Sequence, residues 1–298
     1  GMTRIFVPKD AQSLALGADA VAKAIAAEAS ARGLAVEIVR TGSRGLLWLE
    51  PMVEVERDGR RIAYGPVTRG DVAGLFDAGW LSGGAHALCL GRPEEIPYLA
   101  RQTRLTFARC GIVDPLSPID YAAHGGWAGL ERALAMTGAG IVEEVKASGL
   151  RGRGGAGFPT GIKWATVLQA EADRKYVVCN ADEGDSGTFA DRMLMEGDPF
   201  SLIEGMAIAG LAVGASKGFI YIRSEYPHAY RTMTDAIAAA TEAGYLGASV
   251  MGSGRPFVIE TRLGAGAYIC GEETALLESL EGKRGMVRAK PPLPAIQG

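Results

Sequence analysis

Three short apolar runs, separated by segments of helix length, constrain the fold of this chain most. They read KYVVCN (residues 175–180), KGFIYIR (217–223) and RPFVIETRLG (255–264). Helical patterns at 199–215 and 228–243 bracket the second run, and another helix is expected over 271–282. Strands that alternate with helices predict an α/β fold with helices covering the sheet, and the first run should be buried on both faces.

The first 80 residues predict a separate and smaller unit of the βαβ-then-ββα order. The expected elements are a strand (4–8), an alanine-rich helix (17–33), a strand (34–40), a hairpin with an Asp58-Gly59 turn (52–65) and a closing helix with Thr68 as its N-cap (67–79). Residues 81–115 are interpreted as a connector that contains a helix around 94–111. The second α/β unit is then expected over 116–298.

Composition and charge exclude several classes of protein. The 298 residues carry a formal net charge of −3, so no basic field is available to hold nucleic acid. The longest apolar stretch, 202–222, is interrupted by Glu204 and Lys217, which argues against insertion into a membrane. The four cysteines are far apart and form no CxxC pair. This spacing argues against a zinc ribbon or a disulfide framework and fits the reducing cytoplasm.

The glycine-rich stretch LRGRGGAGFPTGIKW (150–164) is the first candidate site. Gly152, Gly154 and Gly157 match G-x-G-x-x-G, but the preceding segment has a helical pattern, so the context of a dinucleotide fingerprint fails. A Walker A loop fails as well, because Lys163 does not directly follow a glycine. Either this stretch is a flexible linker, or it is a rigid loop whose exposed N–H groups approach a ligand closely. Arg153 and Lys163 would then add charge for a phosphate or a ring system.

The stretch CNADEGDSGTFADR (179–192) is the second candidate. Asp182, Glu183, Asp185 and Asp191 follow a predicted strand, where α/β sheets place functional loops. A solvated loop with helix-capping acids is the alternative. The spacing does not fit an EF-hand calcium loop, because the turn glycine and the terminal Glu are out of place.

The stretch GAGAYICGEETAL (264–276) is the third candidate. Glu272 and Glu273 fall in the first turn of a predicted helix, where the helix dipole alone could explain them. The adjacent Gly-Ala-Gly and Tyr268 suggest a further role, since Tyr268 can present an aromatic face or a hydroxyl group to a flat ligand.

Four ordered motifs carry a resemblance: GRGGAGFPTGIKW, CNADEGDSGTFADR, GAYICGEETALLESLEG and KPPLPA. Together they resemble the NADH-binding flavoprotein family, which includes the 51 kDa subunit of respiratory complex I and the diaphorase subunits of NAD-reducing hydrogenases and NAD-dependent formate dehydrogenases. The likeness extends from about residue 107 to the end. It implies a Rossmann-like α/β domain that binds FMN and NAD(H) and passes electrons to iron–sulfur clusters of a larger complex.

The resemblance also implies residue roles. The residues that match the family's FMN pocket are Gly152, Arg153, Gly154, Gly155, Lys163, Asn180, Asp182, Glu183, Tyr268, Gly271 and Glu272. Phe158 matches a ring that stacks on the nicotinamide nucleotide, and Glu273 and Asp185 match acids near bound NADH. The family usually has Glu at Asp185, and often Phe at Leu293 and Thr166. No catalytic side chain is implied, because hydride passes directly between two aligned cofactor rings.

The first unit resembles the thioredoxin-like [2Fe–2S] domain of a partner subunit. Ser43 and Leu47 stand where that domain's later cysteines are expected, and the stretch DAQSLALG near the first strand has Ser13 and no cysteine. Because iron–sulfur clusters need thiolates, the unit is expected to be degenerate and free of a cluster and of any other metal. A cluster-free domain fused ahead of the flavin domain points to the β subunit of a soluble formate dehydrogenase. Its partners would be a thioredoxin-like [2Fe–2S] γ subunit and a catalytic α subunit.

Relatives continue beyond the KPPLPA motif with a ubiquitin-like domain and a helical bundle that binds a [4Fe–4S] cluster. The chain is therefore expected to be a truncated form, with the [4Fe–4S] cluster confined to the missing part. The alternative is a cofactor-free module that only docks subunits.

Overall fold

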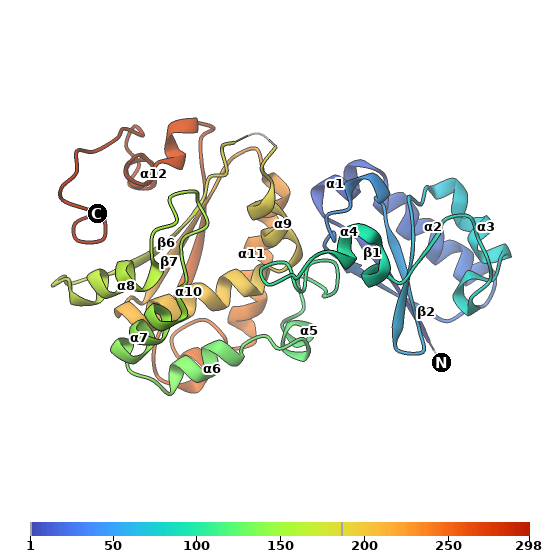
Figure 1. Ribbon diagram of the computed structural model, residues 1–298, viewed down its shortest axis with the longest axis horizontal. Coiled ribbons are helices and arrows are strands. Elements are labelled where there is room, and N and C mark those ends of the chain that lie inside the picture. Colours follow the sequence, from blue (N-terminus) through green and yellow to red (C-terminus); the bar gives the residue numbers. More distant parts are fainter. Residues whose placement is uncertain (1, 186) are drawn as a thin grey trace. The chain divides into compact units, whose positions relative to one another are not determined.

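The computed structural model describes residues 2–185 and 187–298 and divides the chain into two compact units (Figure 1). The first unit comprises the residues up to 115 together with 196–198, and the second comprises 116–195 and 199–298.

The first unit is built on a five-stranded mixed sheet in the order β2-β1-β3-β4-β5. Its elements are β1 (Thr3–Pro8), α1 (Ala11–Ala15), α2 (Ala18–Ala31), β2 (Val36–Thr41), β3 (Val53–Arg57), β4 (Arg60–Tyr64), α3 (Val72–Asp77), β5 (Cys89–Gly91) and α4 (Pro97–Ala100). β1 and β2 are parallel, whereas β3 is antiparallel to β1 and β4 to β3. This βαβ-then-ββα order gives the thioredoxin-like fold that the sequence predicts.

Local sequence signals explain several of these elements. The hairpin between β3 and β4 turns at Asp58 and Gly59, which both have positive φ (50° and 72°), as a tight hairpin turn requires. Thr68 and Asp71 form a reciprocal capping box ahead of α3. Val21 and Ile25 lie on the buried stripe of α2, as the alanine-rich pattern predicts.

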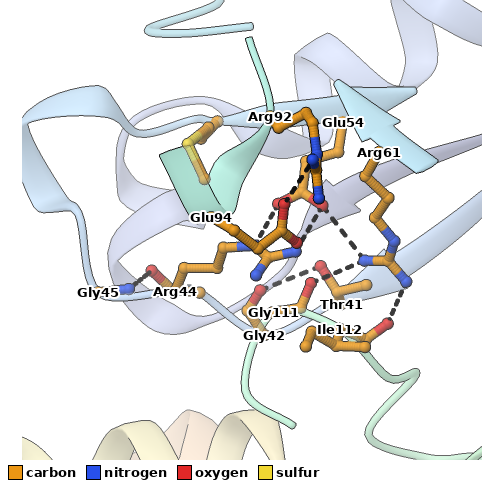
Figure 2. Close-up of polar contacts among 12 residues, drawn as sticks. Thr41, Gly42, Arg44, Gly45, Glu54, Arg61, Arg92, Glu94, Gly111 and Ile112 are labelled. Carbon is orange, nitrogen blue, oxygen red and sulfur yellow. Dashed lines mark hydrogen bonds and ion pairs between the residues drawn. The ribbon is translucent and has the colours of Figure 1, made fainter. Parts of the chain in front are cut away.

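Alternation along the strands separates the two faces of this sheet. On β3, Val53 and Val55 join the fully buried cluster that contains Trp80, while Glu54 between them points to the opposite face. There Glu54 accepts hydrogen bonds from the guanidinium group of Arg44 (2.5 and 3.0 Å) and from that of Arg61 (3.3 Å), as Figure 2 shows. Two arginines therefore share one buried carboxylate.

Residues 81–115 are part of the first unit, so their interpretation as a connector is wrong. β5 extends the sheet by pairing with β4, and Arg61 donates to the carbonyl oxygens of Gly111 (3.0 Å) and Ile112 (2.6 Å). The helix expected around 94–111 is also wrong in length, because only α4 is helical there apart from a preceding 3-10 turn. Leu105 is 85% exposed, so the segment lacks the buried stripe that stabilises a longer helix.

Two serines, from the two segments where the resemblance expects cluster cysteines, bind one buried carboxyl group. Ser13 Oγ donates to Glu50 Oε2 (3.1 Å) and Ser43 Oγ donates to Glu50 Oε1 (2.6 Å), while the backbone N–H of Met52 also donates to Oε2 (2.8 Å). Burial raises the pKa of Glu50 to about 7, and the nearby buried Asp10 adds to this shift. Hydrogen bonds thus join α1 to the segment around residues 43–52, where the resemblance places cluster ligands.

This carboxyl group should make the stability of the first unit depend on pH. Because the pKa of Glu50 is higher in the folded than in the unfolded state, the folded unit binds more protons, and its free energy of unfolding should fall as pH rises from about 4.5 to 7. The shift corresponds to a contribution on the order of 3 kcal/mol. Calorimetric melts should show this slope in the wild type and a clearly weaker slope in Glu50→Gln. An unchanged slope in the variant would assign the proton to another group.

The second unit contains a three-stranded parallel sheet in the order β6-β7-β8 and a helical layer packed on it. Its elements are α5 (Pro118–Ala123), α6 (Ala128–Leu134), α7 (Gly138–Ser148), α8 (Thr160–Gln169), β6 (Tyr176–Ala181), α9 (Ala190–Gly197), α10 (Pro199–Val213), β7 (Lys217–Ile222), α11 (Pro227–Glu242), β8 (Val258–Leu263) and α12 (Glu273–Leu280). All three apolar runs form the predicted strands. This parallel arrangement is the Rossmann-like part of the predicted fold class.

The core of the second unit lies between the sheet and α10. α10 is buried around most of its circumference and contacts β6, β7 and α11. β7 is the central strand and is largely buried. The expectation that β6 is buried on both faces is wrong: Tyr176 is 47% exposed, because β6 forms an edge of the sheet and lacks a neighbour on one side. Across the part of the chain that the structure describes, none of the helices combines the length and apolar character needed to cross a bilayer.

Candidate functional site

The site forms at the C-terminal ends of the three strands of the parallel sheet. Ala181 of β6 pairs with Ile222 of β7, and Ile222 pairs with Leu263 of β8, so the strands end level with one another. The segments that follow the strands, beginning at residues 182, 223 and 264, therefore leave the sheet at the same end. In open α/β sheets, ligands bind at the C-terminal ends of the strands.

Direct contacts join the first and third of these segments. Asn180 Nδ2 donates to the carbonyl oxygen of Gly271 (2.9 Å), and Asn180 Oδ1 accepts from the backbone N–H of Asp182 (3.2 Å). A methyl group built on Gly184 would lie 2.9 Å from the Tyr268 ring, so the missing side chain lets this ring approach the loop. The structure thus brings together Asn180, Asp182, Tyr268 and Gly271 from two separate motifs.

Glu183 connects the same loop to the end of β7. It is 8% exposed, and its two carboxylate oxygens accept from the Tyr226 hydroxyl group (2.8 Å) and from the backbone N–H of Asp191 (2.8 Å). Arg223 donates to the Glu183 carbonyl oxygen. Burial and the bond to Glu183 raise the pKa of Tyr226 to about 12, and burial next to Glu183 raises that of Asp191 to about 6. The Glu183 side chain therefore links the loop after β6 to the segment after β7 and to the start of α9.

Asp182 differs from Glu183 because one of its oxygens is unsatisfied. Oδ2 is buried and has no hydrogen-bond partner among the described residues. Burial raises the pKa of Asp182, an effect that Glu225 increases and Arg223 opposes. An acceptor of this kind can take a hydrogen bond from water or from a ligand. Asp185 is exposed, and the neighbouring Ser186, inside the same motif, lies outside the described residues.

Glu272 and Glu273 stand at the start of α12. Glu272 Oε2 caps the helix by accepting from the backbone N–H groups of Thr274 and Ala275, both at 2.9 Å. Burial alone would raise the pKa of Glu272, but these bonds, the Thr274 hydroxyl group and Lys290 lower it to about 2. Glu273 is exposed and lies 2.7 Å from Lys290. Capping thus explains Glu272 in part but leaves the carboxylate of Glu273 at the surface.

The glycine-rich stretch forms a closed loop between α7 and α8, so the linker alternative is wrong. Thr160 N donates to the Leu150 carbonyl oxygen and Gly152 N to that of Phe158, both at 2.9 Å, and Arg151 Nη1 donates to that of Gly157 (2.8 Å). A short connection, residues 170–175, joins α8 to β6. In Figure 1 the loop rises from α7 toward the end of the unit where α12 lies.

The glycines of this loop are not explained by packing within the protein. A methyl group built on Gly154 would meet no atom within 4 Å, and the φ of Gly154 lies outside the left-handed region. Gly155 and Gly157 also face open space, although their positive φ (98° and 62°) already favours glycine. Arg153, Phe158 and Lys163 are exposed around the loop. Within the described residues the loop shares no hydrogen bond with Asn180 or Tyr268.

Sequence reasoning missed three residues of the site. Tyr226 and Arg223 follow the end of β7, and the rule that strand ends carry functional loops could have found them. Lys290 belongs to the KPPLPA motif, for which the sequence analysis predicted no ion pair. Among residues 2–185 and 187–298, no group of three or more His, Cys, Asp or Glu side chains is arranged to hold a metal ion.

The fold and the site together define a nucleotide-binding α/β domain of the complex I 51 kDa type. The model of the Nuo51 FMN-binding domain matches residues 145–297, and the chain belongs to this family.

Curated relatives and a solved structure extend this likeness. The chain is 56% identical over 198 residues to the NADP-reducing hydrogenase subunit HndC of Solidesulfovibrio fructosivorans, covering 66% of this chain and 40% of that one. It is 58% identical over 179 residues to an NADH-quinone oxidoreductase subunit of Rhizobium meliloti, covering 60% and 42%. An NAD+-reducing [NiFe]-hydrogenase structure matches 99% of this chain and 48% of its own, with a TM-score of 0.51 and 28% identity. The chain therefore spans about two-fifths of these curated relatives.

Proposed function

We propose that this chain binds FMN and NAD(H) and forms the diaphorase module that exchanges hydride between them in a multi-subunit redox complex. The main observation is Gly154 in the closed loop, where no contact within the protein requires a glycine. Family membership supports FMN as the ligand, and the names of the relatives support a nicotinamide nucleotide.

The residues present fit a flat, phosphorylated ligand. A side chain at residue 154 would fill space that the protein leaves open beside the loop. Asp182 Oδ2 is a buried acceptor without a hydrogen-bond partner among the described residues. Arg153 and Lys163 supply exposed positive charge on and beside the glycine loop, as a phosphate requires. A loop of exposed backbone N–H groups and a free acceptor together suit a heterocycle that both donates and accepts hydrogen bonds.

In this proposal the chain binds and orients, and no side chain moves a proton. FMN, when bound, supplies the chemistry of hydride exchange with nicotinamide. Asn180 and Gly271 hold the two loops together, and Glu183 braces them from within, so Asp182 keeps a fixed position. Phe158 and Tyr268 are 50% and 76% exposed, which leaves aromatic faces for nucleotide stacking. Glu273 and Asp185 would face the NAD(H) side.

The proposed partner complex is an NAD-dependent formate dehydrogenase, located in the cytoplasm. Support comes from the first unit, where Ser13 and Ser43 bind Glu50 in the segments in which the resemblance expects the cysteines of a cluster. The proposed partners are a thioredoxin-like [2Fe–2S] subunit and a catalytic subunit. An NAD-reducing hydrogenase is the second candidate, favoured by the structural match that covers 99% of this chain.

Purification of the complex from its native host tests both levels of the proposal. We expect a flavin absorbance spectrum, FMN as the released flavin, and NADH-to-ferricyanide activity. Reduction of NAD+ with formate would support formate dehydrogenase, and reduction with H2 would support hydrogenase. A complex that contains the chain but has no flavin in it would refute the diaphorase proposal and leave a docking module.

A further inference from the structure

Two aromatic side chains of the first unit contact each other at its surface. Trp48, in a 3-10 turn (Leu47–Leu49) after β2, is 59% exposed, and Tyr98 of α4 is 50% exposed. Their ring centres are 5.2 Å apart, and the ring planes stand at 86° to each other. A single exposed aromatic side chain needs no explanation, but two that touch while both stay half open to solvent do.

A small apolar cluster anchors the two short elements that carry these rings. Leu49 and Leu99, the chain neighbours of the two aromatic residues, pack against it. Its buried members are Leu46, Met52, Ala63 and Ile96. The backbone that carries the rings is therefore already ordered, so that a contact with another molecule would cost little conformational entropy.

The chain after α4 extends this surface with an apolar side chain and a hollow. Residues 102–107 line an open hollow of about 370 Å³, and Leu105 among them is 85% exposed. Arg104 connects the hollow to the segment just before the 3-10 turn, because its Nη2 donates to the carbonyl oxygen of Arg44 (2.7 Å). Burial lowers the pKa of Arg104, and Tyr98 is one of the groups that oppose this shift, so the tyrosine lies near the same guanidinium group.

Two cations beside this surface have no ion-pair partner. Arg101 is exposed at the end of α4, and Arg104 follows it. Within residues 2–185 and 187–298, no acidic side chain forms an ion pair with either of them. The acids just before α4, Glu94 and Glu95, lie close to Arg92 instead (3.8 and 3.3 Å). The two arginines after α4 thus keep their charge available for another molecule.

We propose that Trp48, Tyr98 and Leu105, here called the apolar patch, form a docking surface for a protein subunit that presents an apolar area bordered by acidic side chains. Aromatic side chains with arginines beside them are the composition of the contacts that contribute most to protein–protein binding. The unpaired cations beside the patch are complementary to acids on the partner. The inference rests on the proposed function in one respect, because it takes the chain to be part of a multi-subunit complex.

Hydroxyl-radical footprinting tests the apolar patch directly, because the radical modifies exposed aromatic and aliphatic side chains. Between the free chain and the intact complex, the modification rates of Trp48 and Tyr98 should fall by about fivefold or more, since a docked partner excludes water. Leu34, which is exposed ahead of β2, should react equally in both forms. Equal rates for Trp48 in the two forms would overturn the inference. Protection that appears in the free chain as its concentration rises would place a second copy on the patch and would overturn it as well.

Substitutions separate the apolar contribution from the charge. Trp48→Ser should raise the concentration at which the diluted complex releases this chain, measured by mass photometry, by about 10- to 100-fold. Arg101→Glu should raise it by about two- to tenfold, and this difference should shrink as salt is added. Leu34→Ser and Arg60→Glu are the matched controls, because they change an exposed leucine and an exposed arginine elsewhere in the first unit. Both should leave the release concentration unchanged.

The fold of the variants should not change, because Trp48 and Arg101 are both exposed, and circular dichroism checks this. An unchanged release concentration in Trp48→Ser would overturn the inference, as would an equal rise in the two controls. Tighter association of Arg101→Glu would overturn it too, since it would mean that the partner is basic. The footprint of the wild type decides the question even if Trp48→Ser does not fold. A wild-type complex that lacks flavin but protects Trp48 would refute the diaphorase proposal and leave this inference standing.

Discussion

Gly154→Leu should weaken flavin binding so far that the complex purifies with little flavin, while leaving the fold of the chain intact. The wild-type residue lies in open space within a closed loop and has a φ that other residues can adopt, so the protein itself tolerates a side chain there. A bound ring that lies against this backbone would be displaced by a leucine side chain. Overpacking of this kind costs about 1–3 kcal/mol, which corresponds to roughly a 5- to 150-fold loss of FMN affinity.

Gly205→Leu is the matched control for this substitution. Gly205 is an exposed glycine on α10 that also meets no atom within 4 Å and also lies outside the left-handed region. The same leucine there should leave flavin content unchanged and, by improving helix propensity, should stabilise α10 slightly. Flavin fluorescence after release from the purified complex gives occupancy, and circular dichroism reports the fold. A Gly154→Leu complex with full flavin occupancy would contradict the proposed role of the loop.

The order of elements was the part of the fold most open to prediction from sequence. Alternating apolar runs and helical patterns give β6, β7 and β8 with their flanking helices, because local periodicity reflects which face is buried. The structure of residues 81–115 was not predictable in the same way. It depends on long-range bonds, such as those from Arg61 to Gly111 and Ile112, and such bonds leave no periodic signal.

The candidate site was predicted in part. The motifs at 179–192 and 264–276 contain the residues that meet at the sheet edge, because strand ends are recognisable in sequence. Pairings within the site were not predictable. Glu183 satisfies its carboxylate with Tyr226 and Asp191, whereas its neighbour Asp182 leaves one oxygen unsatisfied. Adjacent acids in one motif thus face different environments, and only the three-dimensional arrangement distinguishes the carboxylate with two partners from the one with an unsatisfied oxygen.

The largest effect on stability is expected from Glu54→Ala in the first unit. Glu54 is 3% exposed and is bonded by both Arg44 and Arg61, so its removal leaves the buried guanidinium group of Arg44 and the partly buried group of Arg61 without their shared carboxylate. Breaking a buried ion pair from one side costs about 3–5 kcal/mol. Arg61 also anchors residues 111 and 112, and its guanidinium stacks 3.4 Å from the centre of the Phe6 ring, so a shift of Arg61 would loosen more than one ion pair.

Glu56 lies on the same strand and is the matched control, because it has the same charge as Glu54 but is more exposed. It pairs with Arg4 at 3.6 Å, but its side chain is 34% exposed, so Glu56→Ala should cost less than about 1 kcal/mol. Hydrogen exchange of β3 and β4 in the full chain measures the first unit without interference from the second. Glu54→Gln, which keeps an acceptor oxygen, should lose less than Glu54→Ala and remains measurable if the alanine variant does not fold. Equal and small losses at residues 54 and 56 would contradict the prediction and would mean that the arginines are stabilised by other partners, such as Glu94 near Arg44.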